Sequence, residues 1–308
     1  MKTKFTALVQ RHITQPELFF GLLFAIGAAL GFSAKAIFVK LAYQYHVDAI
    51  TLLMFRMLFA LPFFIFFALV EERKAKKSIP PRQFALIFGL GLLGYYLSSL
   101  FDFLGLQYIS AGLERLILFV YPTFVVILSA LFFGQKIRKE VLFALLLSYV
   151  GIGFAMLHDL EFSEENLLLG AGLVLASTLT YSLFLVGSDQ LIPQVGAKRF
   201  TAYAMMVSCV AVLLNFAVLR DVSTLHQPLA VYGYGLAMAL FSTVLPAFLL
   251  AAAIQRIGAS ETAMIGSLGP VATIGLAAIF LAEPMSWVQM VGAVFVMAGV
   301  AVLGRGKR

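Results

Sequence analysis

Five ionisable side chains interrupt long apolar stretches of this sequence, and they could bind a charged small molecule or pair with one another. They are Lys35, Arg56, Asp102, Glu114 and Arg115. An ionisable group inside a membrane costs roughly 2.5–3.5 kcal/mol or more, and by default it indicates a function. Three of the five are cationic and two are anionic, so one positive charge is left to meet a carboxylate or phosphate.

Helical spacing places polar residues on shared faces. Tyr95, Ser98, Ser99 and Asp102 follow the i, i+3, i+4, i+7 pattern, which predicts one polar stripe facing the interior of a helix bundle. Gly31, Lys35 and Phe38 share a face in the same way. The predicted substrate-binding residues are Lys35, Arg56, Tyr95, Ser99, Asp102 and Tyr181.

The same charged residues have a structural interpretation that stays open. Glu114 and Arg115 are predicted to act in gating or in ion pairs, and Asp102 could pair with them. These three could also direct their charges outward along the helix. Pro122 and Pro270 are predicted helix breaks that free backbone carbonyls at the site, although simple packing kinks are an alternative.

The elements that carry these residues are membrane spans. Of 308 residues, 62% are hydrophobic and 12% are charged, and mean hydropathy is +0.98. Soluble domains have about 25% charged residues, so this composition excludes a cytosolic enzyme and a nucleic-acid-binding domain. The single cysteine, Cys209, excludes an internal disulfide, and the four histidines are not at metal spacing. No metal and no cofactor is expected.

A spanning helix needs about 20 mainly apolar residues, and ten such segments are predicted. An all-α polytopic membrane protein follows. The predicted spans are Leu18–Lys40, Asp48–Val70, Phe84–Leu104, Gly112–Phe133, Val141–Leu157, Leu167–Ser188, Phe200–Leu219, Val231–Ile254, Thr262–Leu281 and Trp287–Gly304.

The distribution of lysine and arginine predicts the orientation. Seventeen of the 22 fall in loops and tails on the side of the N-terminus, while the opposite side shows only Lys40 and Arg220. Positively charged loops stay in the cytoplasm, so both termini are predicted to be cytoplasmic. The first span is too long for a signal peptide, which favours its retention. The expected location is the cell (inner) membrane.

The chain also repeats itself. A shift of 148 residues places 107–111 over 255–259 and Pro122 over Pro270. The chain therefore reads as two five-helix halves, 12–158 and 166–304. Because five is odd, the second half must enter the membrane from the opposite side. Inverted repeats around a central cavity are the usual plan of secondary transporters.

These features resemble the drug/metabolite transporter superfamily, specifically its EamA-type exporters. The resemblance rests on Gly105–Gly112, Tyr121–Pro122, Ile254–Ala259, Gly269–Pro270 and Phe280–Pro284, and it covers about residues 18–304. It implies the ten-helix transporter fold and a transport function, but no particular substrate. Where many relatives carry Trp-Gly in the first helix, this chain has Leu30 and Gly31.

We therefore expect a secondary transporter that exports a small polar or amphipathic metabolite, such as an amino acid, by alternating access. No ATP-binding motif occurs, so coupling would be to protons, through Asp102, Glu114 or Glu261, or absent. The alternative is an intramembrane lipid- or peptide-modifying enzyme, but Ser33 and Lys35 point to different faces of their helix. The expected partners are a small-molecule substrate and the lipid bilayer, with no nucleic acid, and the expected functional unit is a monomer.

Overall fold

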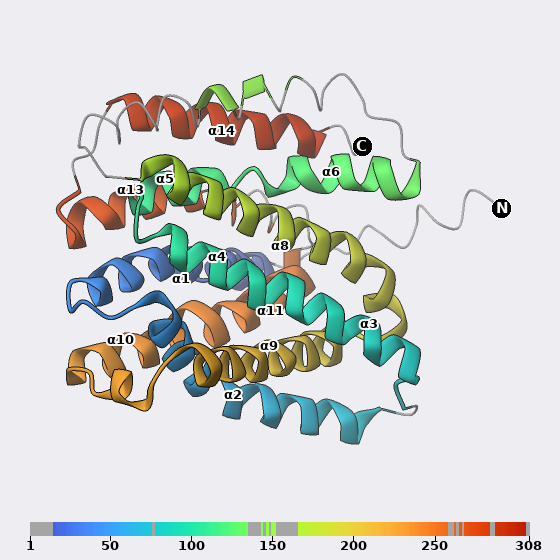
Figure 1. Cartoon of the computed structure of the whole chain (residues 1–308). Coiled ribbons are helices and arrows are strands. Elements are labelled where there is room, and N and C mark those ends of the chain that lie inside the picture. The colour runs from blue at the N-terminus through green and yellow to red at the C-terminus, as the bar shows by residue number, and fades with distance from the viewer. Residues whose placement is uncertain are drawn as a thin grey trace.

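The computed structural model describes residues 15–75, 78–134, 143, 146–147, 149–151, 166–257, 262, 265–266, 268–283 and 287–305. Within them every regular element is helical (Figure 1). Seven stretches of this part of the chain are long and apolar enough to cross a membrane, which makes the chain a multi-pass membrane protein. The longer elements are α1 (Gln15–Tyr43), α2 (Ala49–Lys74), α3 (Pro81–Gly91), α4 (Ser98–Gly105), α5 (Ala111–Leu118), α6 (Tyr121–Phe133), α8 (Leu167–Val195), α9 (Ala197–Leu219), α10 (Leu229–Ala239), α11 (Leu245–Ile257), α13 (Gly269–Phe280) and α14 (Trp287–Arg305).

Short polar sequences set the helix ends. Asp48 begins α2 by accepting hydrogen bonds from the backbone N–H groups of Ile50 (3.0 Å) and Thr51 (3.2 Å). Ser110 begins α5 in the same way, accepting from the N–H of Leu113 at 3.1 Å. Gly134 follows α6 with a φ of 65°, the left-handed conformation that glycine adopts most readily. Short, capped connections of this kind keep successive helices antiparallel.

Several spans are not regular α-helices. The predicted span Gly112–Phe133 is two helices, because α5 ends at Leu118 and α6 begins at Tyr121, directly before Pro122. Between α3 and α4 lies the π-helix η2 (Leu92–Leu97), and between α10 and α11 lies the π-helix η4 (Leu240–Val244). Such π-bulges occur often at functional sites. The sequence did not predict them, because no residue type marks a π-helix as clearly as proline marks a helix break.

The element boundaries recur along the chain. A shift of 148 residues carries the first residue of α2 onto that of α9, α3 onto α10, η2 onto η4, and α6 onto α13. The irregularities therefore recur together with the regular helices. The fifth predicted span, Val141–Leu157, lies largely outside the described residues, so the count of ten stays a prediction.

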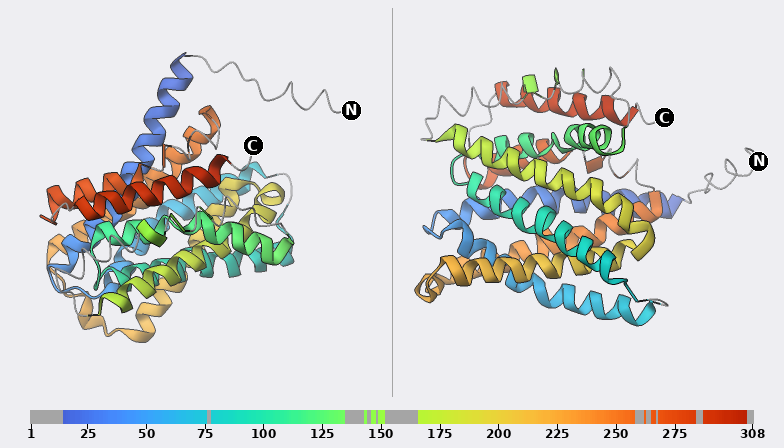
Figure 2. Two further views of the ribbon diagram at one scale, coloured as in Figure 1. Left: turned by 90° about the horizontal axis from the view of Figure 1, so that it is seen from above. Right: turned by 45° about the vertical axis from the view of Figure 1, so that its right-hand side comes forward.

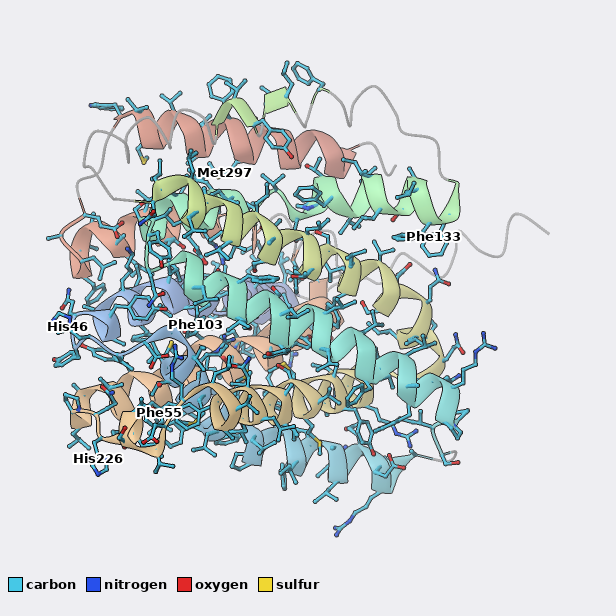
Figure 3. All side chains as sticks on the ribbon, in the orientation of Figure 1. His46, Phe55, Phe103, Phe133, His226 and Met297 are labelled. Atoms are coloured by element: carbon cyan, nitrogen blue, oxygen red, sulfur yellow. The ribbon has the colours of Figure 1, made fainter. Side chains whose placement is uncertain are left out.

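The packing order is seen in Figures 1 and 2. The first helix, α1, packs against α11 and α13, while α8 packs against α4 and α6, and α2 against α9. In Figure 1, α14 lies at one edge of the bundle and α2 at the opposite edge. His46 and His226 lie at one end of the bundle, and Phe133 lies at the other (Figure 3). The helices thus run between two common end surfaces.

Ion pairs connect α2 and α9 at both of these ends. Arg220 Nε is 2.8 Å from Asp48 Oδ1 at one end. At the other, Arg199 donates from Nε (2.8 Å) and Nη2 (2.6 Å) to the Glu72 carboxylate, which also accepts from Tyr203. Burial raises the pKa of Asp48, but hydrogen bonds from Thr51 and Arg220 outweigh burial and hold that pKa below its ordinary value. The α2–α9 contact is therefore held by ion pairs at both ends.

The outer surface is strongly apolar. Large side chains such as Leu229, Val218 and Trp287 are 80–86% exposed. Exposed apolar side chains on this scale suit contact with lipid rather than water. The largest buried side chains, including Phe103 and Phe200, form an interior in which the buried polar residues described below are embedded.

Candidate functional site

One lysine and two carboxylates meet inside the bundle. Lys35 Nζ lies 2.5 Å from Asp102 Oδ2 and 2.8 Å from Glu114 Oε1. The side chains of Asp102 and Glu114 are only 4% and 1% exposed, and that of Lys35 is 14% exposed. This cluster, called here the Lys35 cluster, joins α1, α4 and α5.

Local structure explains why these three residues meet. Asp102 is in the last turn of α4 and Glu114 is in the first turn of α5. The connection between the two helices is short and is capped by Ser110, so both carboxylates lie at the same depth. Glu114 also lies at the N-terminal end of α5, where the helix dipole favours a negative charge.

Arg56 lies beside the cluster but binds hydroxyl groups. Its Nε donates to Thr243 Oγ1 at 2.9 Å, and Nη1 donates to Ser99 Oγ at 3.5 Å. Its guanidinium also lies 5.5 Å from the ring centre of Phe103. Thr243 belongs to η4, so this hydrogen bond connects the first half of the chain to the second. Within the described residues Arg56 has no ion pair.

Arg115 differs from both other cations. Its Nε is buried and has no hydrogen-bond partner among the described residues. The guanidinium lies 5.7 Å from the ring centre of Phe119 and close to Gly269, where an added Cβ would come within 2.7 Å of Nη2. The sequence predicts gating or ion-pair roles for Glu114 and Arg115, and no carboxylate of the described residues lies within ion-pair distance of Arg115. The reason is that Lys35 takes both nearby carboxylates.

The predicted polar stripe on the third span divides among three neighbours. Ser98 Oγ is 3.1 Å from Ser177 Oγ of α8, Ser99 faces Arg56 of α2, and Asp102 faces Lys35 of α1. All these contacts lie inside the bundle, as the spacing predicted. The residues of the stripe therefore contact side chains of three different helices rather than facing one common space.

Aromatic rings lie next to this polar region. The ring of Tyr95 is 4.7 Å from that of Phe184, and the ring of Tyr181 is 5.9 Å from the same phenylalanine. Tyr181 also lies 5.8 Å from Tyr121, which begins α6. The structure thus brings the two tyrosines predicted at the site into one aromatic group.

Two serine hydroxyls donate hydrogen bonds to backbone carbonyls at the helix breaks. Ser33 of α1 donates to the carbonyl of Gly269 at 3.1 Å, and Ser182 of α8 donates to the carbonyl of Tyr121 at 3.2 Å. Each carbonyl belongs to the residue directly before a helix-breaking proline. The partners of these serines could not be inferred without the tertiary structure.

A shallow pocket of about 290 Å³ opens at the C-terminal end of α1. It is lined by Lys40, Tyr43, Gln44, Leu281 and Glu283. The Tyr43 hydroxyl donates to the Phe103 carbonyl at 2.6 Å, next to Asp102. Tyr43 therefore connects this pocket to the helix that carries Asp102 of the Lys35 cluster. Among the described residues no group of three metal-ligating side chains occurs.

Comparison with known proteins identifies the family. A model of the EamA-like transporter family matches residues 19–157 and 168–305. The chain is 32% identical over 278 residues to the uncharacterized transporter YcbK of Bacillus subtilis (strain 168), covering 88% of both proteins. It is 22% identical over 233 residues to the "Probable amino-acid metabolite efflux pump" of Salmonella typhimurium (strain LT2), covering 72% of this chain and 77% of that protein.

A crystal structure with 14% sequence identity has the same fold, with a TM-score of 0.61 over 92% of this chain and 96% of the other. Fold, span composition and family match agree with one another. The chain belongs to the EamA-like transporter family, whose members are transporters and not enzymes.

Proposed function

We propose that this protein is a secondary transporter that exports a small polar or amphipathic metabolite, such as an amino acid, by alternating access. The observation that carries the proposal is the Lys35 cluster, a set of buried charges held between helices of a membrane bundle. Buried charges of this kind commonly mark a substrate or ion pathway in membrane proteins. The relative named as an amino-acid metabolite efflux pump supports the substrate class.

The proposed architecture is two inverted five-helix halves. It is supported by the recurrence of element boundaries after 148 residues and by the matching serine bonds to Gly269 and Tyr121. Packing supports it as well, because exchanging the halves converts the α1–α11 contact into the α8–α4 contact. Inverted halves place the substrate site at their interface, near the middle of the membrane.

The bonds between the proposed halves suit a reversible rearrangement. Ser98–Ser177, Ser33–Gly269 and Arg56–Thr243 all connect residues of one half to residues of the other. A neutral hydrogen bond contributes only about 0.5–1.5 kcal/mol net and one from a charged group about 1.5–3 kcal/mol, so such contacts can exchange as the halves rock. The Lys35 cluster lies within the first half and would move as a unit.

We also propose that the protein lies in the cell (inner) membrane. Both termini then face the cytoplasm. The support is the positive charge of the loops on that side. A reporter fused after Arg308 should then be cytoplasmic, and a reporter inserted at residue 163 should be external. Both reporters on the same side would contradict the inverted arrangement.

Transport by purified protein in proteoliposomes tests the function. Labelled amino acids, nucleosides and organic cations should be screened with and without a pH gradient. We expect saturable uptake of at least one class, and strong loss of uptake in Arg56→Gln compared with Arg73→Gln, which changes an arginine in the last turn of α2. Absence of uptake for every class would overturn the proposal. A requirement for the gradient would indicate proton coupling, and equal uptake without it would indicate facilitated diffusion.

A further inference from the structure

Glu283 is an acidic side chain outside the Lys35 cluster, and it caps a helix that is not its own. It lies shortly after the end of α13, within the stretch Phe280–Pro284. Its Oε1 accepts a hydrogen bond of 3.3 Å from the backbone N–H of Ala111, the first residue of α5. The first N–H groups of an α-helix have no partner within that helix, and the helix dipole there favours a carboxylate.

The bond between Glu283 and Ala111 joins the two proposed halves of the chain. Ala111 belongs to the half 12–158 and Glu283 to the half 166–304, and α13 packs against α5 (Figure 1). The first turn of α5 also carries Glu114, whose carboxylate pairs with Lys35. Glu283 therefore holds the start of a helix that carries part of the Lys35 cluster.

The backbone beside Glu283 is strained. Ala282 has a φ of 53°, a left-handed conformation that glycine adopts readily and alanine seldom adopts. The N–H groups of Leu281 and Glu283 both donate to the carbonyl of Ala277, at 2.9 Å and 3.3 Å, which holds this turn at the end of α13. Strain that the surrounding structure maintains is concentrated at functional sites. In this turn it accompanies the placement of Glu283 against the start of α5.

The pocket of about 290 Å³ lies at this contact and is built from both halves. Its lining residues are Lys40, Tyr43 and Gln44 from α1, with Leu281 and Glu283 from the second half. The Tyr43 wall is held within the first half by its 2.6 Å hydrogen bond to the Phe103 carbonyl. A pocket between two halves widens when they move apart, so its width depends on the wall that carries Glu283.

We propose that Glu283 is a latch on the side of the protein proposed to be external, and that the pocket is the vestibule through which substrate leaves. Glu283 is a positioning residue: its bond to Ala111 keeps the halves together there, and its release opens the vestibule. The inference rests on the proposed transport function and adds a gating residue and an exit to it. A single hydrogen bond is weak enough to break in every cycle. The charged and amide groups of Lys40, Gln44 and Glu283 suit water and a polar solute rather than lipid.

Thiol labelling from each side of the membrane tests the latch without a known substrate. Leu281→Cys reports on the vestibule, and Ser188→Cys reports on the opposite end of the bundle. Leu281 is half-buried, while Ser188 of α8 is only 4% exposed and is related to Lys40 by the shift of 148 residues. Each probe is placed in the full chain with Cys209 replaced by serine. A membrane-impermeant maleimide is applied to right-side-out vesicles for Leu281→Cys and to inside-out vesicles for Ser188→Cys.

Glu283→Ala should raise the labelling rate of Leu281→Cys about fivefold, the effect of losing one hydrogen bond. The same change should lower the labelling rate of Ser188→Cys, because the population moves toward the state that is open to the outside. Glu283→Asp has a shorter side chain that falls short of Ala111, so it should act in the same direction, and it replaces Glu283→Ala if that variant does not fold. Glu283→Gln keeps an oxygen acceptor at the same reach and should label more slowly than Glu283→Ala.

The matched control is Glu71→Ala, which removes an acid whose ion pair with Lys74 lies within the last turns of α2. It should change neither labelling rate.

Two results would overturn the latch. One is an unchanged labelling rate of Leu281→Cys in both Glu283→Ala and Glu283→Asp. The other is faster labelling of both probes, which would show that the variants loosen the whole bundle. Unchanged labelling together with active uptake would refute the latch and leave the transport function standing. If no compound of any class is taken up, the transport function fails, whatever the labelling shows.

Discussion

At the scale of single residues, Lys35 neutralises two carboxylates inside an apolar bundle. Removing one partner of a buried ion pair leaves an uncompensated charge, which is more damaging than removing all partners together. Lys35→Met leaves both Asp102 and Glu114 without a counter-ion, whereas the three changes Lys35→Met, Asp102→Asn and Glu114→Gln leave no charge behind.

We therefore predict that Lys35→Met lowers the free energy of unfolding by about 3–5 kcal/mol, and that the triple variant recovers most of it. Recovery should extend to thermal stability in detergent but not to transport, because Lys35 and Asp102 are also predicted substrate-binding residues. The control is Lys74→Met, whose ion pair with Glu71 is exposed. A Lys35→Met protein as stable as wild type would show that the carboxylates do not depend on the lysine.

The sequence identified the members of this cluster but not their pairing. Lys35, Asp102 and Glu114 stood out because each is ionisable within an apolar span. Which carboxylate meets which cation depends on how helices far apart in sequence pack, and no spacing rule contains that information. Arg115 was predicted to act in gating or ion pairs for the same reason, and that its buried Nε has no hydrogen-bond partner among the described residues appears only when its neighbours are placed.

At the scale of elements, close helix contacts depend on glycine at a few positions. An added Cβ at Gly31 of α1 would lie 2.6 Å from the Phe241 carbonyl and still closer to Pro246 of α11. At Gly89 of α3 an added Cβ would meet nothing within 4 Å. The two glycines therefore form a matched pair for testing the α1–α11 contact.

Gly31→Ala should destabilise the protein by about 1–3 kcal/mol, because overpacking forces the two helices apart. Gly89→Ala should be neutral or slightly stabilising, since alanine favours helix more than glycine does. Melting temperatures of both variants in one detergent check the prediction. Equal effects of the two changes would mean that α1 does not approach α11 as closely as described.

The α2–α9 contact allows a pH prediction at Asp48. The folded state lowers the pKa of Asp48 below 3.8, so its ion pair with Arg220 stabilises the fold above that pH and the stabilisation disappears as pH falls through the lowered value. Asp48→Asn can keep the helix cap but loses the charge, whereas Asp48→Ala loses both and should cost about 1 kcal/mol more.

The measurement is melting temperature against pH for wild type and Asp48→Asn. Wild type should be the more stable protein near neutral pH, and the difference should narrow as pH falls below about 4. A difference that stays constant down to pH 3 would show that the charge of Asp48 contributes nothing.

Helix breaks can be predicted from the sequence more easily than π-helices. The breaks lie where Pro122 and Pro270 stand, because proline lacks the N–H group that a continuous helix needs. The π-helices at Leu92–Leu97 and Leu240–Val244 contain no proline, so no residue of this kind marks them in the sequence. Thr243 Oγ1 donates to the carbonyl of Met238, five residues earlier, which is part of that local geometry.

At the scale of the whole molecule, the account describes two similar halves that alternately open the Lys35 region to each side of the membrane. Ser99 is suited to report this, because its hydroxyl accepts a hydrogen bond from the buried Arg56 and the residue is half-buried. The native cysteine, Cys209, is buried and can be replaced by serine to give a background without thiols.

The most direct test labels Ser99→Cys in that background with a membrane-impermeant thiol reagent, applied to right-side-out and to inside-out vesicles. We predict labelling from both sides, with substrate slowing it from each, and much weaker labelling of Leu93→Cys. Labelling of Ser99→Cys from one side only, with and without substrate, would contradict alternating access.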